Sequence, residues 1–186
     1  MIEEIKKCAR VLRDGGTILY PTDTIWGIGC DATNEAAVQK VFDIKNRPSS
    51  KSMIILVAEV HQISFYAEVP PVALDLAEFS ETPLTIIYPR AKGIAKALVA
   101  EDGSIAIRVV KDEFCKMLID TIRKPLVSTS ANISGEPAPD IFDAIDEDIR
   151  SKVDYVVNLR QHETKKSAPS KIIKIEMDGT FQIIRK

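Results

Sequence analysis

The sequence has no long apolar run, few cysteines and histidines, and little net charge. Its longest apolar stretch, Met53 to Ala58, has six residues, whereas a helix that spans a membrane needs ~20. The first residues, Met1-Ile2-Glu3-Glu4, include two acids and no apolar signal core. These absences predict a cytoplasmic protein without a membrane segment.

Cysteine and histidine are too scarce and too scattered to indicate a metal site. The three cysteines, Cys8, Cys30 and Cys115, form no CxxC pair, and the two histidines, His61 and His162, stand far apart. Neither a disulfide framework nor a zinc site is therefore indicated. We expect reduced thiols, surface histidines and no metal held by a dedicated set of side chains.

The charged residues nearly cancel, with 25 Lys and Arg against 27 Asp and Glu and a net charge of -2. This balance argues against a protein that holds nucleic acid by overall positive charge, although a local basic patch remains open. The sequence also contains neither the GxxxxGK[ST] phosphate loop nor a GxGxxG motif after a strand. Two common classes of nucleotide-binding protein are thus excluded.

What the sequence does contain is a mixture of helical and strand patterns over 186 residues. This length predicts one domain, residues 1–186, since a typical domain has ~150 residues. Helices are predicted at residues 2–12, 34–44, 61–79 (with a break at Pro70-Pro71), 112–124 and 141–152. Strands are predicted at residues 17–20, 53–58, 84–88, 104–110, 125–129, 155–159, 171–176 and 181–184. The mixture indicates an α/β (α+β) fold. In the helix at 112–124, the inward face is expected to comprise Phe114, Met117, Leu118 and Ile122.

A polar loop follows the first predicted strand, within the stretch YPTDTIWGIG at residues 20–29. The hydroxyls of Thr22 and Thr24 flank the Asp23 carboxylate, and such groups at a strand end can bind a small polar ligand. Gly27 and Gly29 let a backbone approach closely. The alternative is an ordinary turn in which Thr22 and Asp23 bind local amides. Taken alone, this stretch favours the turn.

Basic residues gather where the second predicted helix ends, at Lys45, Arg47 and Lys51. An arginine would grip a polyphosphate with its fork, and a lysine would neutralise it as a point charge. The alternative is that these cations favour the carboxyl end of the helix dipole and remain in water.

A third polar cluster, STSANISG at residues 128–135, follows the predicted strand at 125–129. Ligands of sheet proteins bind beyond strand ends, and hydroxyls with exposed backbone N–H groups suit phosphate oxygens. A capping turn is the alternative. A fourth candidate, Arg108, lies in a predicted strand on the face opposite Ile105 and Ile107. It is either a carboxylate clamp or a solvated residue of an edge strand.

Together these motifs resemble one family, the YrdC/TsaC-type threonylcarbamoyl-AMP synthases. The similar stretches are GGTILYPTDTIWGIGCDA (15–32), KNRPSSKSMIILV (45–57), TPLTIIYP (82–89), IAIRV (105–109), PLVSTSANISGEPAP (125–139) and, more weakly, SAPSKII (167–173). They occur in the expected order and cover most of the chain. The KxR and SxN pairs are a specific signature only in combination.

The resemblance implies a single twisted mixed β-sheet with flanking helices around a concave cavity. It also implies a nucleotidyltransferase that converts ATP, L-threonine and bicarbonate (or CO2) into threonylcarbamoyl-AMP and pyrophosphate. Other proteins then use this product for threonylcarbamoyladenosine modification of tRNA. Such a transfer depends on positioning and charge neutralisation rather than on a protein nucleophile. Mg2+ is implied together with ATP, bridging its phosphates, with Asp23 as an outer contact.

The resemblance also implies roles for individual residues. The residues expected at the reacting groups are Lys45, Arg47, Ser130 and Asn132. The residues expected to bind threonine are Thr22, Ser128 and Arg108, which would grip its carboxylate. The residues expected to bind ATP are Lys45, Arg47, Thr85, Ser130, Asn132, Ser134 and Ser170. Leu56 stands where longer members often carry a histidine, so we expect one threonine contact to be absent or replaced.

Two other functions remain open. A patch of Lys45, Arg47 and Lys51 would suit a module that binds double-stranded RNA weakly, through contacts with the RNA backbone. A domain that processes carbamoyl phosphate, as in larger hydrogenase-maturation proteins, is disfavoured because the chain has no CxxC motif. Residues 160–170 are polar and aperiodic, and we expect them to close over the ligands.

Overall fold

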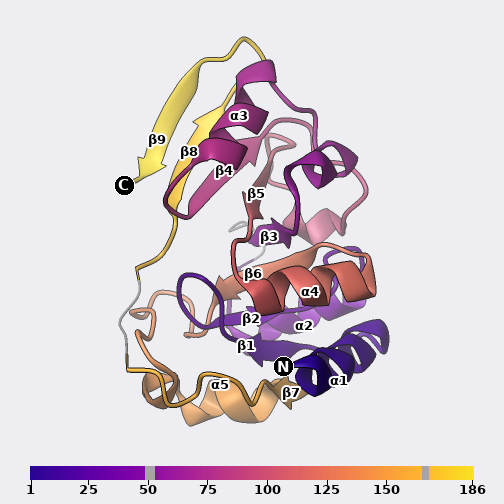
Figure 1. The fold of residues 1–186 in the computed structure, drawn as a ribbon, viewed down its shortest axis with the longest axis vertical. Coiled ribbons are helices and arrows are strands. Elements are labelled where there is room, and N and C mark those ends of the chain that lie inside the picture. Colours follow the sequence, from indigo (N-terminus) through magenta and orange to yellow (C-terminus); the bar gives the residue numbers. More distant parts are fainter. Residues whose placement is uncertain (49–52, 165–167) are drawn as a thin grey trace.

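The structure is a computed structural model that describes residues 1–48, 53–164 and 168–186. Within these residues, a nine-stranded mixed sheet runs in the order β7-β1-β2-β6-β3-β5-β4-β8-β9 (Figure 1). The strands are β1 (Ile18–Tyr20), β2 (Gly27–Gly29), β3 (Ile54–Val57), β4 (Leu84–Tyr88), β5 (Ile105–Val109), β6 (Leu126–Ser130), β7 (Tyr155–Val156), β8 (Lys171–Ile175) and β9 (Phe181–Arg185). The mixed α/β sheet predicted from the sequence is confirmed.

The helices are α1 (Ile2–Arg13), α2 (Glu35–Ile44), α3 (Pro71–Phe79), α4 (Glu113–Ile122) and α5 (Glu147–Lys152), with short 3-10 helices η1 (Val60–Phe65), η2 (Lys96–Leu98) and η3 (Phe142–Ala144). Asn34 caps α2 by accepting the Ala37 N–H, and Asp112 caps α4 by accepting the Cys115 N–H. In the part of the chain that the structure describes, no helix has both the length and the apolar character to cross a bilayer.

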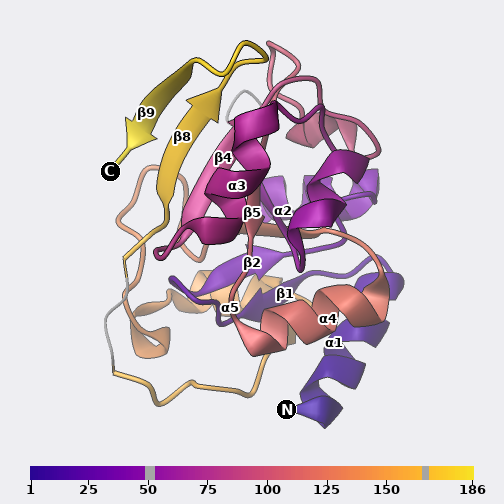
Figure 2. The same cartoon turned by 45° about the horizontal axis from the view of Figure 1, so that its top comes forward.

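Two apolar cores lie on opposite faces of the sheet. On one face α1 and α4 pack side by side over Leu56 of β3 (Figure 2). On the other face α2 and α3 contribute to the core that contains Ile55 and Val57. Successive side chains of a strand point to opposite faces. β3 is therefore apolar on both faces and central in the strand order, as its unbroken apolar run predicts.

A strand that the sequence did not predict, β2, forms at the glycines of the first polar motif. A Cβ atom added at Gly29 would lie 2.2 Å from the Val127 carbonyl oxygen and 2.8 Å from the Tyr20 ring. The Tyr20 hydroxyl donates a hydrogen bond of 3.0 Å to the same carbonyl. Because only glycine fits this approach, β2 can lie between β1 and β6. The loop at 21–26 is thereby placed beside the end of β6.

Three details of the predicted elements are wrong. Residues 141–152 form η3 and α5 rather than one helix, because Asp146 caps a new helix by accepting the Asp148 N–H at 2.7 Å. Met117 does not point inward with the apolar face of α4, since 36% of it is exposed. The strand predicted at 155–159 spans only Tyr155–Val156.

Candidate functional site

A cavity of about 320 Å3 lies on the sheet face that carries Arg108, between the loop at 21–26, the end of β6 and the β8–β9 hairpin. Its polar lining includes Arg47, Arg108, Ser128, Ser130, Ser170 and Arg185. Five of these six residues were predicted from the sequence as site residues. A second hollow of about 350 Å3, between η1 and α4, contains none of the predicted site residues.

Arg108 occupies the middle of the sheet, because β5 pairs with β3 on one side and with β4 on the other. The alternative of a solvated residue on an edge strand is therefore wrong. Arg108 is 3% exposed, and its Nη1 donates a hydrogen bond of 2.7 Å to Asp23 Oδ1. The other Asp23 oxygen accepts the backbone N–H of Lys111 at 3.1 Å. Asp23 thus ties the polar loop to β5, and this pairing occupies the carboxylate that was expected to contact Mg2+.

The predicted KxR and SxN motifs meet at Lys45, which is 1% exposed. Its Nζ donates to the carbonyl oxygens of Ser130 and Asn132, the latter at 2.6 Å. In return, its own carbonyl oxygen accepts the Ser134 N–H at 2.9 Å. Burial, with a smaller contribution from Arg47, lowers the pKa of Lys45 to about 7. Lys45 and Asn132 therefore lie behind the cavity wall and fix the backbone that presents Ser130.

The Thr22 hydroxyl has all its hydrogen-bonding capacity used inside its own loop. It donates to the Ile25 carbonyl oxygen at 2.8 Å and accepts from the Thr24 N–H and hydroxyl at 3.0 and 2.9 Å. Thr22 does not line the cavity, whereas Thr24 and Trp26 do. Thr22, which was predicted to bind threonine, therefore lies behind the cavity lining. It forms the ordinary turn that the sequence analysis gave as the alternative.

Two other predicted ATP contacts lie outside the cavity lining. Thr85 is fully buried, and its hydroxyl is 2.7 Å from that of Ser170, which does line the cavity. Ser134 belongs to the turn after β6 and contacts Lys45 through its backbone. Thr85 therefore holds Ser170 in position through a side-chain hydrogen bond. Ser134 holds the turn that contains Asn132 through its backbone contact with Lys45.

Arg185 of β9 is a cavity residue that the sequence did not indicate. Its Nε and Nη2 donate to the Ser170 carbonyl oxygen at 2.9 and 2.7 Å. Burial, and then the charge of Arg108, lowers the pKa of Arg185. Its place opposite Ile172 depends on a register irregularity between β8 and β9. No local sequence signal distinguishes it from a basic residue at the end of a strand.

The cavity is positively charged. Arg47, Arg108 and Arg185 line it, and the described lining residues include no Asp or Glu. The described residues also hold no group of three or more His, Cys, Asp or Glu that could bind a metal ion. Arginine forks and serine hydroxyls bind carboxylate and phosphate oxygens. The arrangement therefore suits an anionic ligand that brings its own cation.

The segment at 160–170 contacts the polar loop at one described end and the cavity at the other. Arg160 Nη2 donates to the Thr22 carbonyl oxygen at 3.3 Å, and its Nη1 pairs with Asp112 at 2.9 Å. Pro169 and Ser170 line the cavity. Residues 165–167 lie outside the described residues, as does Lys51 of the predicted basic patch. Closure over ligands stays a prediction.

A model of the Sua5/YciO/YrdC family, described as "Telomere recombination", matches residues 10–186. The chain belongs to this family. A relative from Methanocaldococcus jannaschii, provisionally named a threonylcarbamoyl-AMP synthase, is 39% identical over 186 residues, which cover 97% of this chain and 86% of the relative.

Solved structures of this family show the same fold. The structure of Pyrococcus abyssi Sua5 complexed with L-threonine has a TM-score of 0.81 and 28% identity, over 92% of this chain and 50% of that one. The chain thus spans about half the length of that protein. Escherichia coli YciO has a TM-score of 0.86 over 100% of this chain and 90% of its own, at 22% identity. The family expected from the motifs is confirmed.

Proposed function

We propose that this protein is an L-threonylcarbamoyladenylate synthase, a nucleotidyltransferase. The observation that carries the proposal is the cavity itself, in which three arginines and three serines from five segments converge without a carboxylate among the described lining residues. The relatives named threonylcarbamoyl-AMP synthase support the same activity. Its substrates are ATP, L-threonine and bicarbonate or CO2.

The reaction has two bond-forming steps. The threonine amine adds to CO2 and loses a proton, which gives a carbamate. A carbamate oxygen then attacks the α-phosphorus of ATP, and the bond to the β-phosphate oxygen breaks as pyrophosphate leaves with the electron pair. Negative charge gathers on the phosphoryl oxygens during this transfer, so fixed cations stabilise the transition state.

The position of each cavity residue indicates which part of the substrates it binds. Arg47 and Arg185 stand where they can neutralise phosphate oxygens, and Ser130, held by Lys45, presents a hydroxyl and backbone groups to the reacting phosphate. Arg108 lines the cavity and has N–H donors besides the one that binds Asp23, so it can also bind the threonine carboxylate. Ser128 lies on the same strand as Ser130, two residues away, and faces the same cavity.

Mg2+ would enter with ATP rather than through a site made of side chains. The described residues offer no cluster of three ligating groups, and the Asp23 oxygens already bind Arg108 and Lys111. A cation held by phosphate oxygens and water fits this cavity, because Mg2+ binds readily through substrate phosphates. When bound, it supplies further neutralisation of the pyrophosphate that leaves.

The test is pyrophosphate release from purified protein with ATP, L-threonine and bicarbonate. We expect release only when all three are present, and omission of threonine serves as the control. Threonine-independent release, or none from folded protein, would contradict the proposal. Substitution of carbamoyl phosphate for bicarbonate and threonine addresses the hydrogenase-maturation alternative, and we expect no release with it.

Arg47→Ala is expected to lower kcat/KM at least tenfold, or ~1.4 kcal/mol of transition-state stabilisation. The matched control is Arg90→Ala, because Arg90 pairs with Glu68 on the surface, away from the cavity. Steady-state kinetics with ATP varied would compare the two variants. Equal rates in Arg47→Ala and Arg90→Ala would remove Arg47 from the site.

The alternative of a double-stranded RNA module is not favoured. Lys45, one of the three residues of the predicted patch, is buried and bound to carbonyl oxygens, so it cannot meet a phosphate backbone at the surface. RNA affinity measured against salt concentration separates the two functions, because phosphate contacts give a steep dependence. Transfer of the product to tRNA by partner proteins in the cytoplasm is part of the proposal.

A further inference from the structure

Exposed apolar side chains are concentrated at one end of the molecule. Among the described residues eleven large apolar side chains are exposed, and seven of them belong to α3 or to the β8–β9 hairpin. These are Val72, Leu76, Phe79, Met177, Phe181, Ile183 and Ile184, the last of which lines the cavity rather than this surface. Single exposed apolar residues need no explanation, but a gathering of this size marks a surface that another molecule covers.

The register of the hairpin shows which face of the sheet this surface continues. Phe181 pairs with Ile175, and Ile183 pairs with Ile173. Ile175 is buried in the core to which α3 contributes, and Ile173 packs against that core. Directly paired residues point to the same face. The apolar face beneath α3 therefore extends onto β9, where Phe181 is 62% exposed and Ile183 is 53% exposed.

β9 also ends the sheet. In the described part of the chain it pairs with β8 alone, so its outer edge presents unpaired N–H and C=O groups (Figure 2). Edge strands are usually protected by proline, by a central charge or by a bulge that twists them away. The sequence Phe-Gln-Ile-Ile-Arg has no proline and carries its charge at the end. The register irregularity between β8 and β9 falls at Ile184, so the part of the strand that is open to regular pairing is Phe181 to Ile183.

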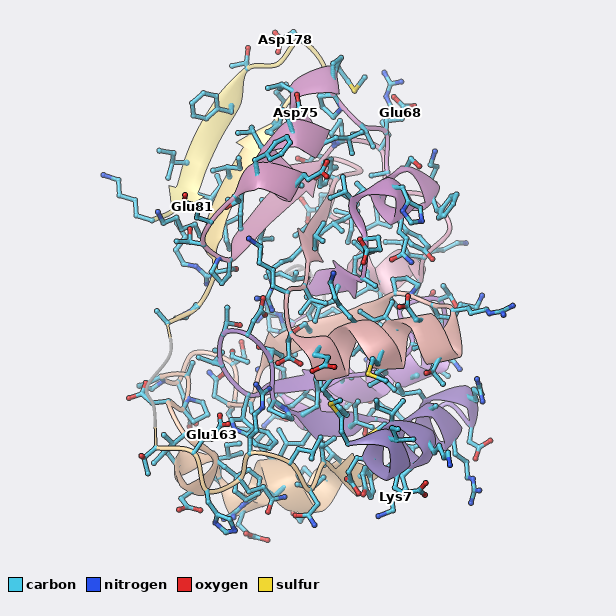
Figure 3. All side chains as sticks on the ribbon, in the orientation of Figure 1. Lys7, Glu68, Asp75, Glu81, Glu163 and Asp178 are labelled. Atoms are coloured by element: carbon cyan, nitrogen blue, oxygen red, sulfur yellow. The ribbon has the colours of Figure 1, made fainter. Side chains whose placement is uncertain are left out.

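We propose that β9 pairs antiparallel with β9 of a second copy of this chain, which continues the sheet across a two-fold axis at Gln182. The two ends of the strand carry opposite charges, so an antiparallel pair of identical strands is electrostatically complementary. Glu176 and Asp178 precede the strand, and Figure 3 shows Asp178 at the hairpin tip, whereas Arg185 is its last residue and Lys186 follows. Antiparallel pairing brings the basic end of each copy to the acidic tip of the other. Parallel pairing would place like charges together.

The same arrangement pairs the apolar side chains. With Gln182 on the axis, Phe181 of one copy stands opposite Ile183 of the other, and aromatic with β-branched pairs stabilise antiparallel strands. Arg185 and Ile184 of β9 line the cavity, so the pairing also holds one wall of that cavity. The dimer itself follows from exposure, register and charge, and it does not depend on the proposed activity.

Sedimentation velocity over a range of concentrations tests the dimer. One strand pair and a few side chains form a small interface. We therefore expect a dimer with a dissociation constant of ~10–100 µM. Phe181→Glu is expected to remain monomeric throughout. Phe65→Glu is the matched control, since Phe65 is 61% exposed and lies on η1. A monomeric wild-type protein at all concentrations, or equal loss in both variants, would overturn the proposal.

A cysteine substitution tests the register. All three native cysteines are buried, so an introduced thiol is the reactive one. Opposed antiparallel residues have Cα atoms ~4.5–5.5 Å apart, which a disulfide can span. Gln182→Cys is expected to form a cross-linked dimer on mild oxidation, while Gln39→Cys on exposed α2 surface stays monomeric. Equal cross-linking of both variants, or none with Gln182→Cys, contradicts an axis at Gln182.

Discussion

Two basic side chains that are almost fully buried hold the cavity walls through different partners. Arg108 pairs with the Asp23 carboxylate, and Lys45 is bound by the carbonyl oxygens of Ser130 and Asn132. A buried charge is stable only with such partners. Each of these side chains therefore fixes the position of a polar loop.

Arg108→Met is expected to lower the free energy of unfolding by ~3 kcal/mol, because it leaves the Asp23 carboxylate in the interior without its partner. The pyrophosphate-release rate should also fall by about tenfold or more, since the carboxylate clamp is lost. Denaturant unfolding and steady-state kinetics measure the two effects.

The double variant Arg108→Met/Asp23→Asn separates them. It removes both charges, so we expect part of the stability to return while the activity stays low. Recovery of activity in the double variant would show that Arg108 serves only to neutralise Asp23.

The lowered pKa of Lys45 predicts that the free energy of unfolding increases with pH above neutrality. Its pKa is lowered from 10.5 to about 7 by burial. Between these values the unfolded chain binds a proton at Lys45 and the folded protein does not, so stability rises with pH, by up to ~1.4 kcal/mol per unit. The unfolding free energy of the wild type relative to Lys45→Met should therefore increase from pH 7 to pH 9. A difference that is constant over this range would refute the lowered pKa.

At the level of elements, the loop at 21–26 is anchored from both sides. Asp23 binds Arg108 of β5 and the Lys111 N–H on the inner side. Arg160 binds the Thr22 carbonyl oxygen and Asp112, the capping residue of α4, on the outer side. Arg160 has a φ of 56°, a left-handed conformation that favours glycine. Its side-chain contacts offset that local cost.

Arg160→Gly is expected to keep the fold, because glycine accepts the left-handed backbone, and to raise KM for threonine by about threefold or more as the loop loses its outer anchor. Arg90→Gly is the matched control, since Arg90 also has a positive φ of 52° and pairs with Glu68. Thermal unfolding and KM would be measured for both. Unchanged kinetics in Arg160→Gly would mean that the outer contacts do not position the loop.

The elements that the sequence predicted well are those whose signal is local. The helices predicted at 34–44 and 112–124 are present as α2 and α4, and the strands predicted at 171–176 and 181–184 are present as β8 and β9. β2 was missed because its glycines carry no apolar alternation, and its formation depends on the close approach to Val127. Tertiary contacts of this kind leave no periodic pattern in the sequence.

The sequence predicted which residues gather at the candidate site, but it did not predict which of them line the cavity and which lie behind it. The motifs identified Arg47, Arg108, Ser128, Ser130 and Ser170, which do line the cavity. They could not show that Lys45 and Thr22 face the protein backbone, because the direction of a side chain depends on where a distant loop packs. Arg185 was missed because it enters through the register of the final strand.

For the whole molecule, near neutrality coexists with a cationic cavity. The net charge is -2, yet three arginines line the site. An acidic exterior with a local positive site favours small anions over a nucleic acid backbone. The fold supports this separation, because β5, β6 and β9 of one sheet each contribute an arginine or serine to the same cavity.

The most direct test of this account follows the carbon atom from bicarbonate into product. Purified protein would be incubated with ATP, L-threonine and carbon-13 bicarbonate, and the nucleotide products would be analysed by mass spectrometry. We predict a threonylcarbamoyl adenylate that carries the label and forms in step with pyrophosphate. Pyrophosphate release without labelled adenylate, or a labelled product that does not require threonine, would contradict the account.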